Sequence, residues 1–558
     1  MKTSEPRNIR SADIAVAVVT GIWLVGSRAM LGVPWGFHPE PTGDLVNVGI
    51  VDNPADTWFY LSCVQQYCHG ALFAGILYTT EPHAALLWSF PLWLIGHLAA
   101  WTHLPVIGVY NAAGLSAAIA AMLLFRRAAA ALRLSPAAIN WASLALLLGS
   151  GSSWLWHLAS KFGSAPRADG GDLFFLDLFP STAFLVFPYH TAGLALLAGL
   201  WWTSTELENR CYAREPVRGW LAGTVGFALL LAFSRPYEPL AFLGAWTLKS
   251  LWHAGQWRRD PDAARAAFVV LAVLGLASAP GLWWTRWLSQ QPGVWSSFAQ
   301  GALALGLSRT AWLVTLAGGA LLAGLGARLA WKNSPRAAVL PLAASLLMAV
   351  ILLSWDPAPA KMAGGLILGP ILLAGWGAVR VIAAFAARPR IVQVGVSALA
   401  LSCLLGTGSL ALNLRAFALR GPTFVDRQLI ALAAALPWQP GSLPPVVLTD
   451  AATGAVLPGL AGARVWLGHW AFSRDYAFQA ELLKRAGFDP AGHPPRGPEA
   501  AAALSSVLSS SPFDYALLDE RSQQVRTELL DRGWTQLRSA GQWNLLRAPV
   551  AGQVKSAL

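Results

Sequence analysis

Residues 45–83 read LVNVGIVDNPADTWFYLSCVQQYCHGALFAGILYTTEPH and lie between two long apolar segments. The stretch carries Asp52, Asp56 and Glu81, and no Lys or Arg occurs between residues 32 and 100. A connection of this length is as a rule functional or disordered, and its many aromatic and aliphatic residues argue against disorder. We therefore expect residues 32–85 to form a large outer loop that carries an active site.

The rest of the chain has the composition of a membrane protein. Its 558 residues have a mean hydropathy of +0.49, with 55% hydrophobic and 12% charged residues. An ordinary soluble domain has about twice that charged fraction. Apolar runs of about 18 residues or more, long enough to cross a bilayer, recur between residues 12 and 414. The sequence predicts an α-helical polytopic membrane domain over residues 1–420, with about 11–13 transmembrane helices.

The distribution of basic residues predicts how the chain is oriented. The net charge is +12, but Lys and Arg lie in short clusters between the apolar runs, which is how membrane proteins encode orientation. A single basic stripe would favour nucleic acid, so we expect no nucleic-acid partner. Lys2, Arg7 and Arg10 precede the first apolar run. We expect a cytoplasmic N-terminus in the inner (plasma) membrane and an extracytoplasmic C-terminal domain.

One apolar segment, residues 86–101, interrupts the alternation of basic clusters. It is short and contains Pro91 and His97. Two alternatives stay open: the segment is a re-entrant or interfacial helix, or it crosses the membrane and another segment restores the count.

The chain becomes more charged after the Pro/Gly-rich break at residues 437–445. Short apolar runs predict strands at 446–449, 515–518 and 543–547, and the intervening patterns predict helices at 476–486, 499–508 and 523–532. Strands that alternate with helices are typical of α/β domains. We expect residues 421–558 to form a small soluble α/β domain with three or four strands.

Polar residues on the predicted outer side mark candidate sites, because ionisable groups at membrane depth are costly and usually functional. The expected catalytic carboxylate is Asp56, with Asp52 as its competitor. The expected substrate-binding residues are Tyr60, Glu81, His83, Tyr189, His190, Arg235, Tyr237, Glu238 and Lys361.

Several of these residues also have a purely structural interpretation. Arg235 could pair with Glu238 within its turn, and His190 could be an interfacial histidine with a backbone partner. Asp56 could cap the helix that follows it. Cys63 and Cys68, next to His69, match no standard zinc spacing, so we expect no metal site there.

Short motifs carry a resemblance to a known superfamily. They are D-T-W-F-Y at 56–60, Y-T-T-E-P-H at 78–83, F-P-Y-H at 187–190, R-P-Y-E at 235–238, D-A-A-T-G-A-V-L-P at 450–458 and V-W-L-G-H-W at 465–470. With the first span, the acidic outer loop, the further spans and the soluble tail, the chain resembles the GT-C integral-membrane glycosyltransferases, and more narrowly a little-characterised bacterial multi-spanning group.

The resemblance implies transfer of a sugar, on the outer side of the membrane, from a polyprenyl-phosphate-linked donor to an acceptor. It also implies that an acidic residue of the first outer loop, Asp56 or Asp52, acts as the base. That loop lacks an Asp-x-Asp or a paired Asp-Glu, so no cofactor is expected, although a divalent metal stays open. The alternative function is a transporter or flippase of a lipid-linked or small polar solute, for which inverted repeats would be typical.

Overall fold

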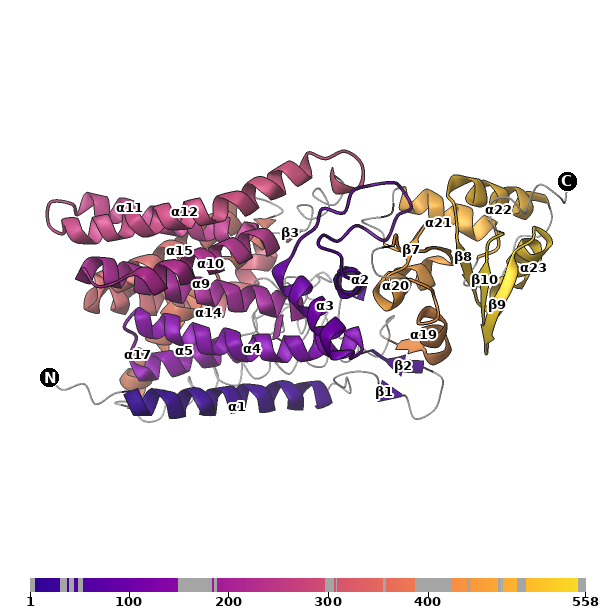
Figure 1. Ribbon diagram of the computed structural model, residues 1–558. Helices are drawn as coiled ribbons and strands as arrows, with labels where there is room; N and C mark the ends of the chain where they lie inside the picture. Colours follow the sequence, from indigo (N-terminus) through magenta and orange to yellow (C-terminus); the bar gives the residue numbers. More distant parts are fainter. Residues whose placement is uncertain are drawn as a thin grey trace. The chain divides into compact units, whose positions relative to one another are not determined.

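The computed structural model is mainly helical (Figure 1). It describes residues 6–30, 38–39, 45–48, 54–148, 183–184, 188–296, 306–307, 309–354, 358–386, 424–438, 442–469, 473, 475–488 and 498–549. The chain divides into two compact units. The first comprises Met1–Gly32, Ala112–Trp287 and Ala302–Ala416, and the second comprises Val33–Asn111, Leu288–Gly301 and Phe417–Leu558. The boundary expected between residues 420 and 421 stays a prediction.

The first unit consists of long apolar helices. They are α1 (Pro6–Met30), most of α4 (Val106–Ala131), α5 (Pro136–Leu148), α9 (Pro188–Ala213), α10 (Arg218–Ser234), α11 (Tyr237–Gly255), most of α12 (Pro261–Ser289), α14 (Arg309–Asn333), α15 (Pro335–Ser354), the short α16 (Ala360–Gly364) and α17 (Leu368–Ala386). The two-residue strands β3 (Gly306–Leu307) and β4 (Ala358–Pro359) pair antiparallel.

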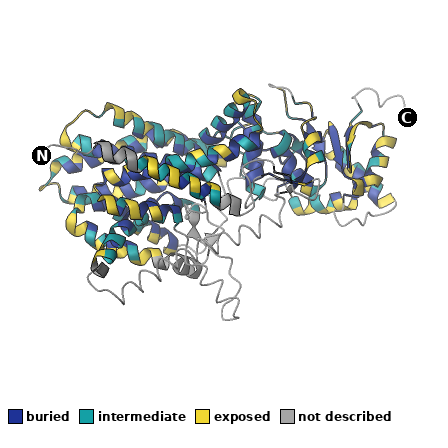
Figure 2. Cartoon of the chain, turned by 90° about the horizontal axis from the view of Figure 1, so that it is seen from below, coloured by how far each residue is buried: buried dark blue, intermediate teal, exposed yellow. Residues whose placement is uncertain are grey.

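Three helices of the described chain, α4, α12 and α15, are long and apolar enough by themselves to cross a membrane. Many residues along these and neighbouring helices are exposed (Figure 2). Large apolar residues are among them, for example Leu276 at 78% and Leu321 at 70%. Exposed apolar helix faces are expected where lipid rather than water is the solvent. The chain is therefore a polytopic membrane protein, as predicted, and the number of 11–13 spans stays a prediction.

Small residues allow the helices of this unit to approach closely. A Cβ added to Gly326 of α14 would lie 1.7 Å from the carbonyl oxygen of Leu373, and one added to Gly377 of α17 would lie 2.1 Å from that of Leu322. Small residues at such interfaces are typical of membrane helices, which associate by close packing.

The second unit contains α2 (Pro54–Cys68), from the segment at 32–85, and α3 (Phe90–Thr102), which follows that segment. Helix α3 has 13 residues, and at about 1.5 Å per residue it is shorter than the roughly 30 Å hydrocarbon core of a bilayer. Gly96 of α3 packs against α2, since a Cβ there would lie 2.5 Å from Cβ of Tyr67. The apolar segment at 86–101 thus forms most of a short helix, Phe90–Thr102, that is packed against α2.

The C-terminal part of this unit is an α/β domain. Its strands are β6 (Val446–Leu448), β7 (Arg464–Val465), β8 (Tyr515–Leu518), β9 (Thr535–Ala540) and β10 (Trp543–Arg547), in the order β7-β6-β8-β10-β9. Strand β6 is parallel to β7 and β8, and β10 is antiparallel to β8 and β9. Its helices are α19 (Arg427–Ala433), α20 (Ala451–Ala461), α21 (Tyr476–Arg485), α22 (Pro498–Ser510) and α23 (Gln523–Asp531).

The predicted α/β domain is confirmed, with five strands instead of three or four. All four residues of β8 are buried, and β6 is also fully buried, which explains why both were visible as apolar runs. Strand β9 is an exposed edge strand with the polar sequence TQLRSA, and it was missed for that reason. A further small antiparallel sheet joins β1 (His38–Pro39), β2 (Leu45–Asn47) and β5 (Phe424–Asp426).

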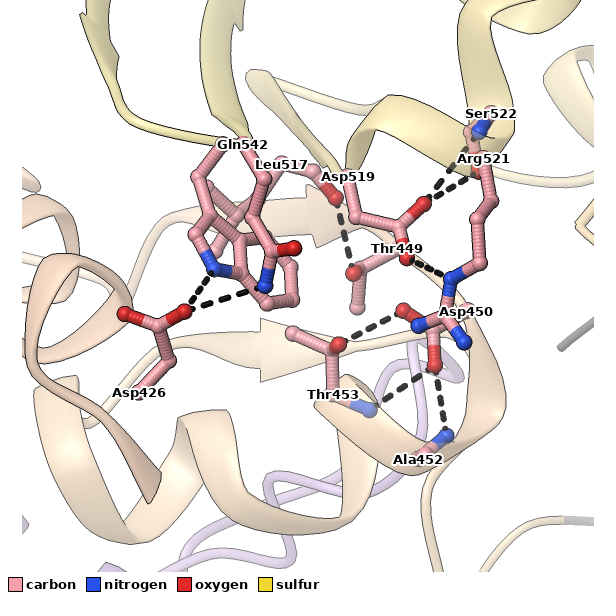
Figure 3. Close-up of polar contacts among 11 residues, drawn as sticks. Asp426, Thr449, Asp450, Ala452, Thr453, Leu517, Asp519, Arg521, Ser522 and Gln542 are labelled. Atoms are coloured by element: carbon pink, nitrogen blue, oxygen red, sulfur yellow. Dashed lines mark hydrogen bonds and ion pairs between the residues drawn. The ribbon is translucent and has the colours of Figure 1, made fainter. Parts of the chain in front are cut away.

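Polar side chains fix the ends of strands β6 and β8 (Figure 3). The Thr449 hydroxyl donates to the carbonyl of Leu517 at 2.8 Å, so the chain stays joined to β8 one residue beyond the end of β6. The Asp450 carboxylate caps α20 by accepting from the N–H groups of Ala452 and Thr453. Asp519 likewise caps a 3-10 turn (Glu520–Ser522). Such caps satisfy helix N–H groups that have no partner inside the helix.

Candidate active site

Asp56 lies in the first turn of α2, which begins at Pro54. Proline suits a helix start, because its missing N–H would lack a helical partner there. The helix starts earlier than the sequence suggested, so Asp56 lies inside the first turn rather than before it. Its side chain is 39% exposed, and Oδ1 lies 3.8 Å from Nε2 of His469, whose side chain is 2% exposed. One side of the carboxylate thus faces solvent and the other faces a buried imidazole.

His469 is held by a compact set of hydrogen bonds. The Ser473 hydroxyl accepts from the backbone N–H groups of Gly468 (3.2 Å) and His469 (3.4 Å) and donates to the carbonyl of Tyr78 at 2.8 Å. The Tyr78 ring packs edge-on against the imidazole, with centroids 5.4 Å apart. His469 is not among the site residues predicted from the sequence, where it stands as a single histidine inside the apolar motif V-W-L-G-H-W.

Tyr78 is a neutral neighbour of this pair. Burial, and then the proximity of Cys63 and Asp56, raises the pKa of Tyr78 well above its ordinary value. Its hydroxyl donates to the carbonyl of Ala455 at 3.2 Å. Burial also raises the pKa of the Cys63 thiol to about 12. Both groups therefore stay protonated near neutral pH.

Helix α20 packs directly against α2 through a glycine. A Cβ added to Gly459 would lie 2.6 Å from Cε3 of Trp58 and 3.0 Å from its carbonyl oxygen. The Gln65 amide donates to the carbonyl of Leu460 at 2.9 Å. The D-A-A-T-G-A-V-L-P motif therefore begins the helix that supports the Asp56 helix.

The segment after α2 is organised by His83. Its Nε2 accepts from the Ile76 N–H at 3.0 Å, and its Nδ1 donates to the carbonyl of Glu81 at 2.7 Å, which fixes a neutral tautomer. Burial is the largest influence on the pKa of His83 and lowers it, and Arg464 lowers it further against the opposing effects of Glu81. The Arg464 guanidinium donates to the carbonyls of Thr79 and Glu81. His83 and the Glu81 backbone thus shape a turn next to the Asp56 pair.

The first unit brings four other candidates together. Arg235 follows α10, and its Nε donates to Oε1 of Glu238 at 2.5 Å while Nη1 donates to Nδ1 of His190 at 2.8 Å. Its guanidinium lies 5.7 Å from the ring centroid of Tyr189, whose hydroxyl donates to the carbonyl of Ser234. The Arg235 and Glu238 side chains are 9% and 6% exposed. The pairing of Arg235 with Glu238 that the sequence allowed is present, and His190 is a third member.

A glycine makes room for this group. A Cβ added to Gly193 of α9 would lie 2.2 Å from Cδ of Arg235. Near Glu238, a Cβ at Gly365 would lie 2.4 Å from the Glu238 carbonyl oxygen.

The remaining candidates are dispersed. Tyr237 is the first residue of α11, Lys361 lies on α16, and Tyr60 lies on α2 with its ring 5.8 Å from that of Phe59. All three side chains are partly buried. Asp52 lies outside the described residues.

The candidate residues belong to two separate units. Asp56 and His469 (the Asp56 group) lie in the second unit, and Arg235 with Glu238, His190 and Tyr189 (the Arg235 group) lies in the first. Among the described residues, no three His, Cys, Asp or Glu side chains are arranged to hold a metal ion.

Comparisons with known proteins identify the fold. No protein-family model and no curated protein sequence matches the chain. Among solved structures, the mycobacterial arabinofuranosyltransferase AftD is 15% identical with a TM-score of 0.57, over 98% of this chain and 42% of that one. The Archaeoglobus fulgidus oligosaccharyltransferase AglB, in complex with an inhibitory peptide and a dolichol-phosphate, is 12% identical with a TM-score of 0.53, over 97% and 74%.

The chain has the GT-C fold. Another such structure is ArnT from Cupriavidus metallidurans bound to undecaprenyl phosphate, at 13% identity and a TM-score of 0.49 over 98% of this chain and 99% of that one. The resemblance predicted from the motifs is confirmed at the level of the fold. At these identities, the GT-C fold alone is shared, and activity has to be argued from this chain's own residues.

Proposed function

We propose that the protein is a membrane glycosyltransferase that moves a sugar from a polyprenyl-phosphate-linked donor to an acceptor on the outer face of the membrane. The observation that supports the proposal is the environment of Asp56, a partly exposed carboxylate in the first turn of α2, next to the buried His469, in a chain with the GT-C fold. Structural neighbours that are glycosyltransferases, one of them with a bound dolichol-phosphate, support this class of donor.

In the proposed reaction, an acceptor hydroxyl attacks the anomeric carbon of the donor sugar. The new bond joins the acceptor oxygen to this carbon, and the bond between the carbon and the phosphate oxygen breaks. Asp56 takes the proton of the hydroxyl, and polyprenyl phosphate leaves with the electron pair. General-base assistance of this kind contributes about 10²–10⁴-fold in rate. Asp52 stays the alternative carboxylate.

Arg235 is the proposed partner of the donor phosphate. Guanidinium groups bind phosphate oxygens through two parallel N–H bonds, and the contacts to Glu238 and His190 hold this guanidinium in a fixed orientation. Tyr189, Tyr237 and Lys361 complete the proposed donor site, and Tyr60, Glu81 and His83 the proposed acceptor side. We propose no cofactor. A cytoplasmic N-terminus and an external C-terminal domain in the inner membrane are part of the proposal.

A deletion strain tests the proposed function. Strains complemented with the wild-type chain, Asp56→Asn or the exposed control Glu499→Gln are compared by mass spectrometry of envelope glycoconjugates and lipid-linked sugars. We expect deletion and Asp56→Asn to remove one sugar from a glycoconjugate and to accumulate a polyprenyl-phosphate sugar on the outer leaflet. Accumulation on the inner leaflet instead would favour the flippase, and an unchanged envelope would refute both functions.

A further inference from the structure

We propose that His469 is a positioning residue for Asp56, which holds the carboxylate from its buried side and receives the proton that Asp56 takes from the acceptor. This inference rests on the proposed function. It assigns a role in the reaction to the C-terminal α/β domain, because His469 follows β7 in that domain.

The imidazole lies in a prepared position. Its Nε2 is 3.8 Å from Oδ1 of Asp56, close enough for a strong charge interaction and for proton transfer after a small approach. The backbone on both sides is fixed by Ser473, and the ring edge is covered by Tyr78. Both residues belong to the same compact unit, so the distance is a property of that unit.

The position of Asp56 explains why a second group is useful. The first turn of a helix stabilises negative charge, which makes a carboxylate there a weaker base. Ordinary aspartate binds protons near pH 4 and ordinary histidine near pH 6.5. An imidazole in general binds a proton more firmly than a carboxylate does. An imidazole next to Asp56 can therefore keep the proton that the carboxylate takes from the acceptor.

The proposed transfer is balanced within the pair. Before reaction, Asp56 is ionised and His469 is neutral. The acceptor proton binds to the carboxylate and then to Nε2 of His469, which leaves an imidazolium next to a carboxylate. This ion pair loses the proton to water after polyprenyl phosphate departs, and the starting state returns.

Tyr78, whose ring packs against the imidazole, is neutral near neutral pH, because burial raises the pKa of its hydroxyl well above the ordinary value. Asp56 supplies a negative charge on the Nε2 side of His469.

Histidine NMR tests the coupling without any substrate. The full-length protein, labelled in its histidines and held in detergent micelles, is compared in its wild-type and variant forms, and His469 is assigned from the signal that His469→Gln removes. We expect the ring nitrogen and proton shifts of His469 to change in Asp56→Asn, because the carboxylate charge next to Nε2 is lost. Tyr78→Phe, the matched control, keeps that charge and should change these signals less. Identical His469 ring signals in wild type and Asp56→Asn would overturn the inference.

Turnover in complemented cells separates this inference from the proposed function. Product formation is followed in media from pH 5.5 to 8. We expect His469→Gln to be about tenfold slower than wild type at pH 7 and to have a different pH profile, because the carboxylate can no longer pass its proton to an imidazole. Undecaprenyl phosphate binding should be unchanged in His469→Gln, which shows that the variant is folded. If Asp56→Asn is inactive while His469→Gln keeps the wild-type rate and profile, only the role of His469 fails. If Asp56→Asn is fully active, Asp56 is not the base and the proposed function fails in that part.

Discussion

Lys249 Nζ lies 2.5 Å from Oε2 of Glu208, and the two side chains are 1% and 3% exposed. This ion pair joins α11 to α9, and His253 Nε2 lies 3.7 Å from the other Glu208 oxygen. The same two helices carry Glu238 and His190 at their N-terminal ends. They are therefore connected twice, once by the Arg235 group and once by the Lys249 pair.

Removing one member of the buried pair should destabilise the first unit strongly. Lys249→Met leaves Glu208 as an uncompensated buried charge, for which we expect a loss of about 3–5 kcal/mol in the free energy of unfolding. The double variant Glu208→Leu/Lys249→Met should recover most of it, because apolar residues can replace a buried pair. Thermal unfolding of the purified protein in detergent measures both. Arg214→Ala, which removes an exposed ion pair with Asp262, should change little. A double variant as unstable as the single one would contradict this account.

Asp56→Asn should abolish transfer while the protein still folds. We expect a loss of about 10²–10⁴-fold in turnover, since the amide cannot accept the acceptor proton. The loss of a negative charge from the first helical turn should cost only about 0.3–1 kcal/mol of stability. Turnover and thermal unfolding are measured on the same preparation. Near-normal turnover would make Asp56 a structural residue and move the catalytic role to Asp52.

Arg235→Lys should weaken binding of the lipid phosphate. A single ammonium cannot reproduce the directed bonds to Glu238 and His190 and also the fork that binds phosphate. Hydrogen bonds to charged groups contribute about 1.5–3 kcal/mol, so we expect binding of undecaprenyl phosphate to weaken by about 10–100-fold. The exposed Arg265→Lys serves as the control. If Arg235→Ala bound the lipid as wild type does, Arg235 would be a partner of Glu238 only.

The stability of the second unit should decrease with acid because of His83. Its pKa is lowered from the ordinary value of 6.5, so the unfolded chain binds a proton at a higher pH than the folded one. The free energy of unfolding should therefore be highest above pH 6.5 and fall as the pH drops from there through the lowered pKa. His83→Gln should remove part of this dependence of the unfolding free energy on pH. His97→Gln, the control, should leave that part in place. Denaturation curves between pH 4 and 8 measure it, and an unaltered slope in His83→Gln would refute the assignment.

Gly459→Ala should disturb the contact between α20 and α2. The new Cβ would lie 2.6 Å from the Trp58 ring, and overpacking of this kind costs about 1–3 kcal/mol. Gly108→Ala is the matched control, since a Cβ there meets nothing within 4 Å. Limited proteolysis and thermal unfolding compare the two variants. If Gly459→Ala were as stable as Gly108→Ala, α20 and α2 would be able to move apart enough for the added Cβ without loss of stability.

Strands and helices with a recognisable pattern of apolar residues could be predicted from the sequence. Contacts between residues far apart in the chain could not, because they depend on how the elements pack together. Strand β8 is apolar throughout and was predicted with its observed bounds, whereas β9 is polar because it is an exposed edge. Arg235 and Glu238 are three residues apart, so their pairing could be foreseen. His469 could not be foreseen next to Asp56, because that proximity depends on how α20 packs against α2.

The second unit is assembled from three separated parts of the chain, and the last of them ends at residue 558. The carbonyls of Leu77 and Tyr78 accept hydrogen bonds from Val465 and Ser473, residues that leave the ribosome long after Leu77 and Tyr78 have been made. Domains generally fold as units during synthesis, so these carbonyls have to wait for the C-terminal domain before they are satisfied. A ribosome that stops before residue 464 therefore produces a chain in which the segment around Leu77 and Tyr78 lacks these partners and is open to proteolysis.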